Sequence, residues 1–194
     1  MIYVIMGKSA TGKDTIFNKL LRNKQLGLTK IVPYTTRPRR TGEIEGHEYH
    51  FVNEERMGEL EAAGLIVEHR QYDTVHGIWH YFTVDDNELV RQTDIRYAMI
   101  GTLEAYVSLK EYYGDGLVVP IYIKVDDFER LRRAVNREKR QANPNCEEIC
   151  RRYLADERDF SEDKLASAGI DRCYVNNSIK ECVADIVNDI KSVR

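Results

Sequence analysis

The residues with the clearest chemistry form a glycine-rich segment near the N-terminus, Gly7-Lys8-Ser9-Ala10-Thr11-Gly12-Lys13-Asp14. This segment fits the phosphate-binding pattern G-x-x-x-x-G-K-[ST] at every position except the last. Glycines let backbone N–H groups turn inward around an anion, and the lysine can reach the outer phosphates of a nucleotide. The pattern predicts a phosphate cradle made by Gly7, Ser9, Ala10, Thr11, Gly12, Lys13, Asp14 and Thr15.

The last position of this pattern holds Asp14 where a hydroxyl residue is usual, and Thr15 follows it. A carboxylate is a hard oxygen donor that can ligate magnesium, although it also brings negative charge close to the phosphates. We therefore interpret Asp14 as a candidate ligand of Mg²⁺. The alternative is a glycine-rich turn that caps a helix and binds no ligand.

A second cluster contains three arginines within four residues, Arg37, Arg39 and Arg40, between Pro33 and Thr41. Prolines exclude a helix here, so the guanidinium groups are free to grip a phosphate, and Tyr49 adds a phenolic donor. The alternative is a solvated basic loop.

Basic residues gather again between residues 129 and 152, interrupted at 141–145. They are Arg130, Arg132, Arg133, Arg137, Lys139, Arg140, Arg151 and Arg152. Two such helices flanking a turn are similar to the lid of nucleoside monophosphate kinases, which neutralises charge on the transferring phosphoryl group. A solvated pair of charged helices is the alternative.

These groups need a scaffold, and the hydrophobic pattern predicts an α/β fold. The apolar run Ile2–Met6 reads as a buried parallel strand, and the apolar stripe in 15–21 predicts the helix that follows the glycine-rich loop. Further strands are expected at 28–32, 65–68, 97–100, 117–125 and 173–177, and further helices at 53–63, 103–113, 179–193 and on both sides of 141–145. Pro120 suggests that pairing in its strand begins near Ile121.

Composition narrows the class of protein. The chain has 194 residues, which suits one domain, and 29 basic against 32 acidic residues give a net charge of −3. This balance gives no support for a nucleic-acid or membrane partner, and no apolar run reaches the length of a membrane span. The four cysteines form no C-x-x-C pair and follow no signal sequence, so we expect a reduced, cytoplasmic protein without zinc.

The arginine cluster also carries a family resemblance. Thr36, Arg37, Arg40, Gly42, Glu43, Gly46, Tyr49 and Phe51 match T-R-x-P-R-x-G-E-x-x-G-x-x-Y-x-F, with the proline one residue early at Pro38. This signature resembles that of guanylate kinases, and the resemblance extends loosely over residues 1–193. It implies that Arg37, Arg40 and Tyr49 hold the phosphate of GMP and that Glu68 accepts hydrogen bonds from guanine. It further implies acceptor contacts by Tyr81 and Thr83, a donor-base contact by Asn176, and lid roles for Arg137, Arg140 and Arg152.

The chain departs from the family at two places. Pro33 stands where a guanine-reading serine is usual, and Met99-Ile100-Gly101 replaces a D-x-D motif, with no carboxylate until Glu104. These changes keep two alternatives open, a kinase of altered acceptor specificity and a non-catalytic guanylate-kinase-like binding module.

The sequence as a whole predicts a single phosphate-loop α/β domain. Its parts are a core (1–32, 89–125 and 161–194), an acceptor-binding insertion (33–88) and a helical lid (126–160). The expected reaction is transfer of the ATP γ-phosphate to GMP with Mg²⁺, catalysed by Lys13 and the lid arginines. Oligomeric state is left open.

Overall fold

The protein is described here by a computed structural model that covers residues 1–74, 77–85 and 95–192. Its central element is a five-stranded sheet in the order β2-β7-β1-β8-β9, with every pair of neighbours parallel. The strands are β1 (Ile2–Met6), β2 (Leu28–Lys30), β7 (Arg96–Ile100), β8 (Val118–Lys124) and β9 (Tyr174–Val175). This arrangement confirms the predicted parallel α/β architecture.

Helices cover both faces of this sheet because β1 is apolar on both sides. Tyr3 and Ile5 pack with α1 (Lys13–Arg22) and α7 (Ile179–Ser192), whereas Val4 and Met6 pack with α3 (Leu103–Tyr113). All five residues of β1 are buried, as expected of a central strand in a two-sided sheet. The phosphate loop therefore begins at the end of a strand whose five residues are all buried.

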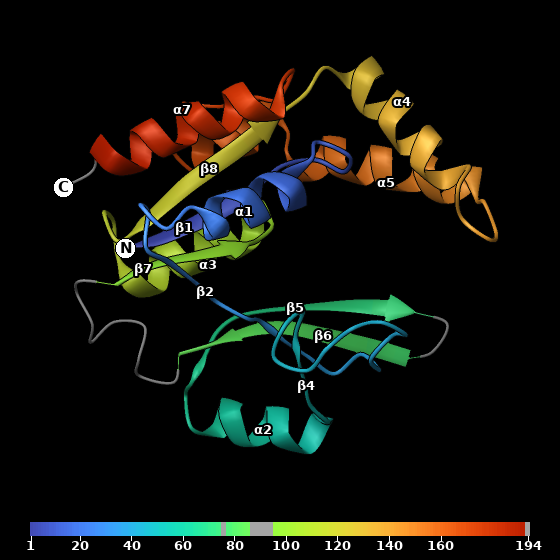
Figure 1. Ribbon diagram of the computed structural model, residues 1–194. Coiled ribbons are helices and arrows are strands. Elements are labelled where there is room, and N and C mark those ends of the chain that lie inside the picture. The colour runs from blue at the N-terminus through green and yellow to red at the C-terminus, as the bar shows by residue number, and fades with distance from the viewer. Residues whose placement is uncertain (75–76, 86–94, 193–194) are drawn as a thin grey trace.

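A second, four-stranded sheet lies beneath the core as a separate layer (Figure 1), in the order β4-β3-β6-β5. Its strands are β3 (Tyr34–Thr35), β4 (His50–Phe51), β5 (Ile66–Thr74) and β6 (Gly77–Val84). Helix α2 (Glu54–Ala62) packs Met57 and Leu60 against Phe82 and Val84 of β6. This small sheet lies within residues 33–88, where the sequence analysis expects an acceptor-binding insertion, and residues 86–88 lie outside the described residues.

Two helices, α4 (Asp127–Glu138) and α5 (Cys146–Asp159), extend beyond the end of the sheet (Figure 1), and the short α6 (Glu162–Ser167) follows them. Asp126 caps α4 by accepting from the Phe128 and Glu129 N–H groups, and Asn145 caps α5 by accepting from Glu148 N–H. Among the described helices, none is long and apolar enough to cross a membrane.

Two local expectations need correction. Pairing of β8 begins at Val118, and Pro120 lies opposite Val4 of β1. We attribute this tolerance to the β9 side of β8, where pairing is recorded only at Ile123 and Lys124, so a missing N–H at Pro120 need not break the ladder. The strand expected at 65–68 also continues to Thr74 because it forms an antiparallel hairpin with β6.

Candidate active site

The glycine-rich loop leaves β1 and ends at the first turn of α1, as the pattern predicts. A methyl group at Gly7 would lie 2.5 Å from the Ile123 carbonyl oxygen, so the loop can pass under β8 only without a side chain there. Gly12 caps α1 with φ of 84°, and a methyl group on it would lie 2.7 Å from Asn176 Nδ2. Close packing against backbone therefore requires Gly7, and the left-handed conformation favours glycine at Gly12.

A cavity of about 340 Å³ opens over this loop. The loop and α1 contribute one wall, α4 and α5 contribute arginines, and the lining residues are Ser9, Ala10, Gly12, Lys13, Asp14, Thr15, Arg133, Arg137 and Arg152. The N-terminus of α1 adds its positive dipole end to these cations. The cavity can bind a polyanion such as a triphosphate.

Two of the three expected lid arginines, Arg137 and Arg152, line this cavity, and Arg140 does not. Helix α4 ends at Glu138, and Arg140 instead lines an outer hollow beside Arg132 and Gln141. Arg133, which the sequence analysis did not select, takes a place in the cavity. Helical spacing was the available signal, because Arg133 and Arg137 are four residues apart and share a face.

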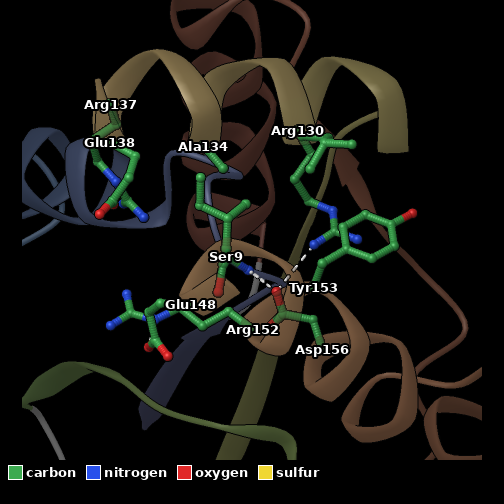
Figure 2. A pocket seen from close by; sticks show the side chains of 11 residues that line it. Ser9, Arg130, Ala134, Arg137, Glu138, Glu148, Arg152, Tyr153 and Asp156 are labelled. Carbon is green, nitrogen blue, oxygen red and sulfur yellow. Dashed lines mark hydrogen bonds and ion pairs between the residues drawn. The ribbon is translucent and has the colours of Figure 1, made fainter. Parts of the chain in front are cut away.

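The base of the two lid helices is tied to the phosphate loop through a buried arginine (Figure 2). Arg130 is 2% exposed and its Nη1 donates to Asp156 Oδ2 at 3.0 Å, while the same carboxylate oxygen accepts from the Ser9 N–H at 2.8 Å. Arg130 also pairs with Asp127 and Glu157, and Glu157 pairs with Lys8. These carboxylates belong to no motif that is visible in the sequence alone.

Lys13 also lines a second, larger cavity of about 860 Å³, together with Gly7 of the loop. Tyr72 of β5 and the start of α3, including Thr102 and Glu104, form other parts of its wall. Lys13 is therefore shared by the cavity of the lid arginines and by a cleft that reaches the small sheet. A group transferred between two ligands would pass beside its ammonium group.

In the loop that follows β3, Arg37 is 3% exposed and forms a bidentate ion pair with Glu43, with N···O distances of 2.9 and 2.8 Å. This hydrogen bonding to Arg37 lowers the pKa of Glu43 to about 2. Glu43 also accepts from the backbone N–H of Arg40 at 2.7 Å, so the loop is closed around its carboxylate. Arg40 itself is exposed to solvent.

Aromatic rings surround this arginine. The guanidinium carbon of Arg37 lies 5.4 Å from the centre of the Tyr49 ring and 5.6 Å from that of Phe51. The Tyr49 and Tyr81 rings meet edge to face with centroids 5.6 Å apart, and burial raises the pKa of Tyr49. Arg37 and Tyr49, which the arginine signature selected, are thus brought together with Tyr81, which the wider resemblance selected.

Glu68 and Thr83 are also brought together, because they are partners across the β5–β6 hairpin. Thr83 Oγ1 donates to Glu68 Oε1 at 2.9 Å inside the sheet. The same carboxylate is held by Arg70, which the sequence analysis did not select. Alternation along β5 was the available signal, since residues two apart on a strand share a face.

Asn176 lies beneath the phosphate loop and is 1% exposed. Its side-chain Nδ2 donates to the Thr11 backbone carbonyl at 2.7 Å, and the backbone carbonyl of Asn176 accepts from Arg133 Nη2 at 3.2 Å. In this position Asn176 supports the loop that forms the phosphate cavity and connects it to α4.

Residues 99–101 stand where a D-x-D motif is expected, and close packing disfavours a side chain at the last of these positions, Gly101. A methyl group at Gly101 would lie 2.9 Å from Cγ1 of the buried Val4, so a side chain there would crowd the core. Within the described residues no three His, Cys, Asp or Glu side chains gather into a metal site. Asp14, exposed at the rim of the phosphate cavity, is the carboxylate nearest in sequence to the cradle lysine.

Comparison with known proteins gives a consistent result. The family model described as Guanylate kinase matches residues 1–92. The guanylate kinase of Caldanaerobacter subterraneus subsp. tengcongensis is 30% identical over 79% of this chain and 70% of its own length, and that of Anaplasma phagocytophilum is 28% identical over 99% and 86%. The crystal structure of the Anaplasma enzyme superposes with a TM-score of 0.71 at 26% identity, covering 99% of this chain and 85% of that one.

Proposed function

The chain belongs to the guanylate kinase family, and from this premise we propose that it transfers the γ-phosphoryl group of ATP to GMP, giving ADP and GDP. The observation that carries the proposal is the position of Lys13, which lines both the arginine-rich phosphate cavity and the cleft that reaches the small sheet. Phosphoryl transfer needs two ligands in line and a cation between them.

On the donor side, the inward backbone of residues 7–15 binds the ATP phosphates, and Lys13 neutralises the charge on the transferring group. Arg137 and Arg152 act from the lid, and Arg133 joins them; the shared cavity supports this assignment. Asn176 contributes by holding the loop at the Thr11 carbonyl. These groups work by positioning and charge neutralisation, without a covalent intermediate.

On the acceptor side, Arg37, Arg40 and Tyr49 hold the GMP phosphate, with Tyr81 beside them. The Arg37–Glu43 pair supports this role because it fixes the guanidinium plane before the ligand arrives. We assign Glu68 and Thr83 to the site that binds the guanine base of GMP. The burial of Glu68 in a hydrogen-bonded cluster favours an orienting function there.

Nucleotide kinases of this family use a divalent metal, and we propose Mg²⁺ held with Asp14 and Thr15. The donor set fits, because a carboxylate and a hydroxyl oxygen at the rim of a phosphate cavity are hard ligands of the kind this ion prefers. When bound, the ion screens the β- and γ-phosphate charge. Asp14 supplies the acidic oxygen that the crowded Gly101 position does not offer.

A coupled assay of ADP release with GMP, dGMP, AMP, CMP and UMP tests this function. We expect turnover that is largest with GMP and that depends on ATP and a divalent metal. No turnover with any of the five monophosphates would overturn the proposal and favour a binding module.

A further inference from the structure

Arg70 lies on the same face of β5 as Tyr72, a residue that lines the larger cleft beside Lys13. Opposite partners across the hairpin are Glu68 with Thr83 and Arg70 with Tyr81. Residues two apart on a strand point to the same face, so Glu68, Arg70 and Tyr72 form one row. Tyr72 lines the cleft that also contains Lys13. Arg70 is therefore the middle residue of this row, between the buried Glu68 and Tyr72, which lines the cleft.

The Glu68 carboxylate has little capacity left for a ligand. Its Oε2 accepts from Arg70 Nε at 2.9 Å, and its Oε1 accepts from Arg70 Nη2 at 3.1 Å and from Thr83 Oγ1 at 2.9 Å. A carboxylate offers about four lone-pair sites, so three of them are used. The Glu68 side chain is 1% exposed, whereas that of Arg70 is 14% exposed. Arg70 is therefore the more accessible member of this ion pair.

Arg70 retains donors for such a ligand. Its Nε–Nη2 edge is spent on Glu68, and a guanidinium carries five N–H groups in a planar fork. Within the described part of the chain, its Nη1–Nη2 edge has no hydrogen-bond acceptor. This edge presents two parallel N–H donors, and the ion pair with Glu68 fixes the plane in which they lie.

We propose that Arg70 is a specificity-determining residue that reads the O6 and N7 acceptors of the acceptor base, with Glu68 orienting it. The inference rests on the proposed function and deepens it. A two-donor guanidinium edge matches these adjacent acceptors of guanine, whereas adenine presents an amine donor in place of O6. The 2-amine of guanine lies on another edge of the base. Hypoxanthine, which lacks this amine, therefore meets the same contact.

Kinetics with modified acceptors test Arg70 directly. At saturating ATP and Mg²⁺ we expect kcat/KM for IMP within about tenfold of that for GMP, since the lost 2-amine is not read. 7-Deaza-GMP lacks the N7 acceptor and should lose about tenfold relative to GMP. In Arg70→Met, GMP and IMP should both fall about 10- to 100-fold, and the 7-deaza penalty should disappear.

Arg56→Met is the matched control, because Arg56 pairs with Glu59 on the exposed face of α2 in the same small layer. It should leave all three acceptors unchanged. Arg70→Lys, which keeps the charge beside Glu68 but loses the planar fork, should keep part of GMP turnover and lose the 7-deaza penalty.

The inference is overturned if wild type phosphorylates GMP but treats 7-deaza-GMP as well as GMP, or if IMP falls more than 100-fold below GMP. Both comparisons use wild-type protein, so they decide even if Arg70→Met does not fold. A 7-deaza penalty that persists in the Arg70 variants would likewise assign Arg70 a purely structural role. Absence of GMP turnover in wild type is a separate result, which removes the proposed function itself.

Discussion

The two nucleotide-facing regions of this molecule are built in different ways. Around the phosphate loop, the cavity is lined by the loop, the first turn of α1, Lys13 and three lid arginines, and the loop is tied to the lid by Arg130 and Asp156. In the small layer, Arg37 and Arg70 are largely buried guanidinium groups that are already paired with Glu43 and Glu68.

Because of this difference, we expect the phosphate loop to determine how strongly phosphates bind and the small layer to determine which acceptor binds. A backbone cradle binds any polyphosphate of the right shape, and its geometry depends on the packing beneath it. Paired guanidinium groups present fewer donors, but in fixed planes, and fixed donors discriminate between ligands. We therefore expect changes at the phosphate loop to affect folding and turnover, and changes on the small sheet to affect the choice and binding of the acceptor.

The largest effect should follow from Arg130→Met, which leaves Asp127, Asp156 and Glu157 without their buried cation. Loss of this cation should cost about 3 kcal/mol of unfolding free energy, the low end for a buried pair, because Asp127 and Glu157 are 49% and 36% exposed and water screens their charge. Urea unfolding measures this, with Arg132→Met as the control because Arg132 pairs with Glu129 on the exposed side of the same helix. Equal stability of the two variants would contradict the role assigned to Arg130.

Lys13→Met should lower kcat by about 10²–10³-fold, since it removes the cation at the junction of the two cavities. Unfolding free energy should change little. Steady-state rates measure the effect, and Lys19→Met on the exposed side of α1 is the control. A kcat within threefold of wild type would place the transferring phosphate away from Lys13.

Glu68→Gln should weaken GMP binding by about 1.5–3 kcal/mol, because the amide loses the charge that orients Arg70 and receives the Thr83 hydroxyl. The KM for ATP should stay close to that of wild type. Measuring both Michaelis constants decides the point, and equal losses for ATP and GMP would count against a role for Glu68 on the acceptor side.

Asp14→Ser should raise the Mg²⁺ concentration for half-maximal activity about tenfold, even though serine fits the loop pattern. The reason is that Gly101 offers no second carboxylate. Thr15→Val, made in parallel, separates the contribution of the neighbouring hydroxyl. If Asp14→Ser is as active as wild type at limiting Mg²⁺, Asp14 does not hold the metal.

The smallest effect concerns the pH dependence of the Arg37–Glu43 pair. Because its native pKa is lowered from 4.5 to about 2, Glu43 contributes its full stability above pH 4.5 and loses it as the pH falls towards 2. Urea unfolding of wild type and Glu43→Gln should show a gap of about 1 kcal/mol at pH 7 that closes across this window. A gap that stays constant down to pH 2 would refute the linkage.

Local sequence was enough to predict the elements that carry the phosphate loop. The apolar run Ile2–Met6, the glycine pattern and the stripe on α1 each follow from short-range spacing, and α3 was predicted at the residues where it is found. The signature around Arg37 was equally local, and it selected Tyr49, which the structure places against that arginine. Short-range patterns report such features because they need no information about distant partners.

The pairing of charged side chains was decided only by tertiary structure. Arg130, Asp156 and Ser9 lie far apart in sequence and meet because α4 and α5 pack beside the loop. Arg70 holds Glu68 because β5 continues as a hairpin strand, and Arg140 misses the phosphate cavity because α4 ends before it. The sequence by itself shows which residues can form ion pairs, but the choice of partner depends on helix ends, strand register and burial, which the complete fold sets.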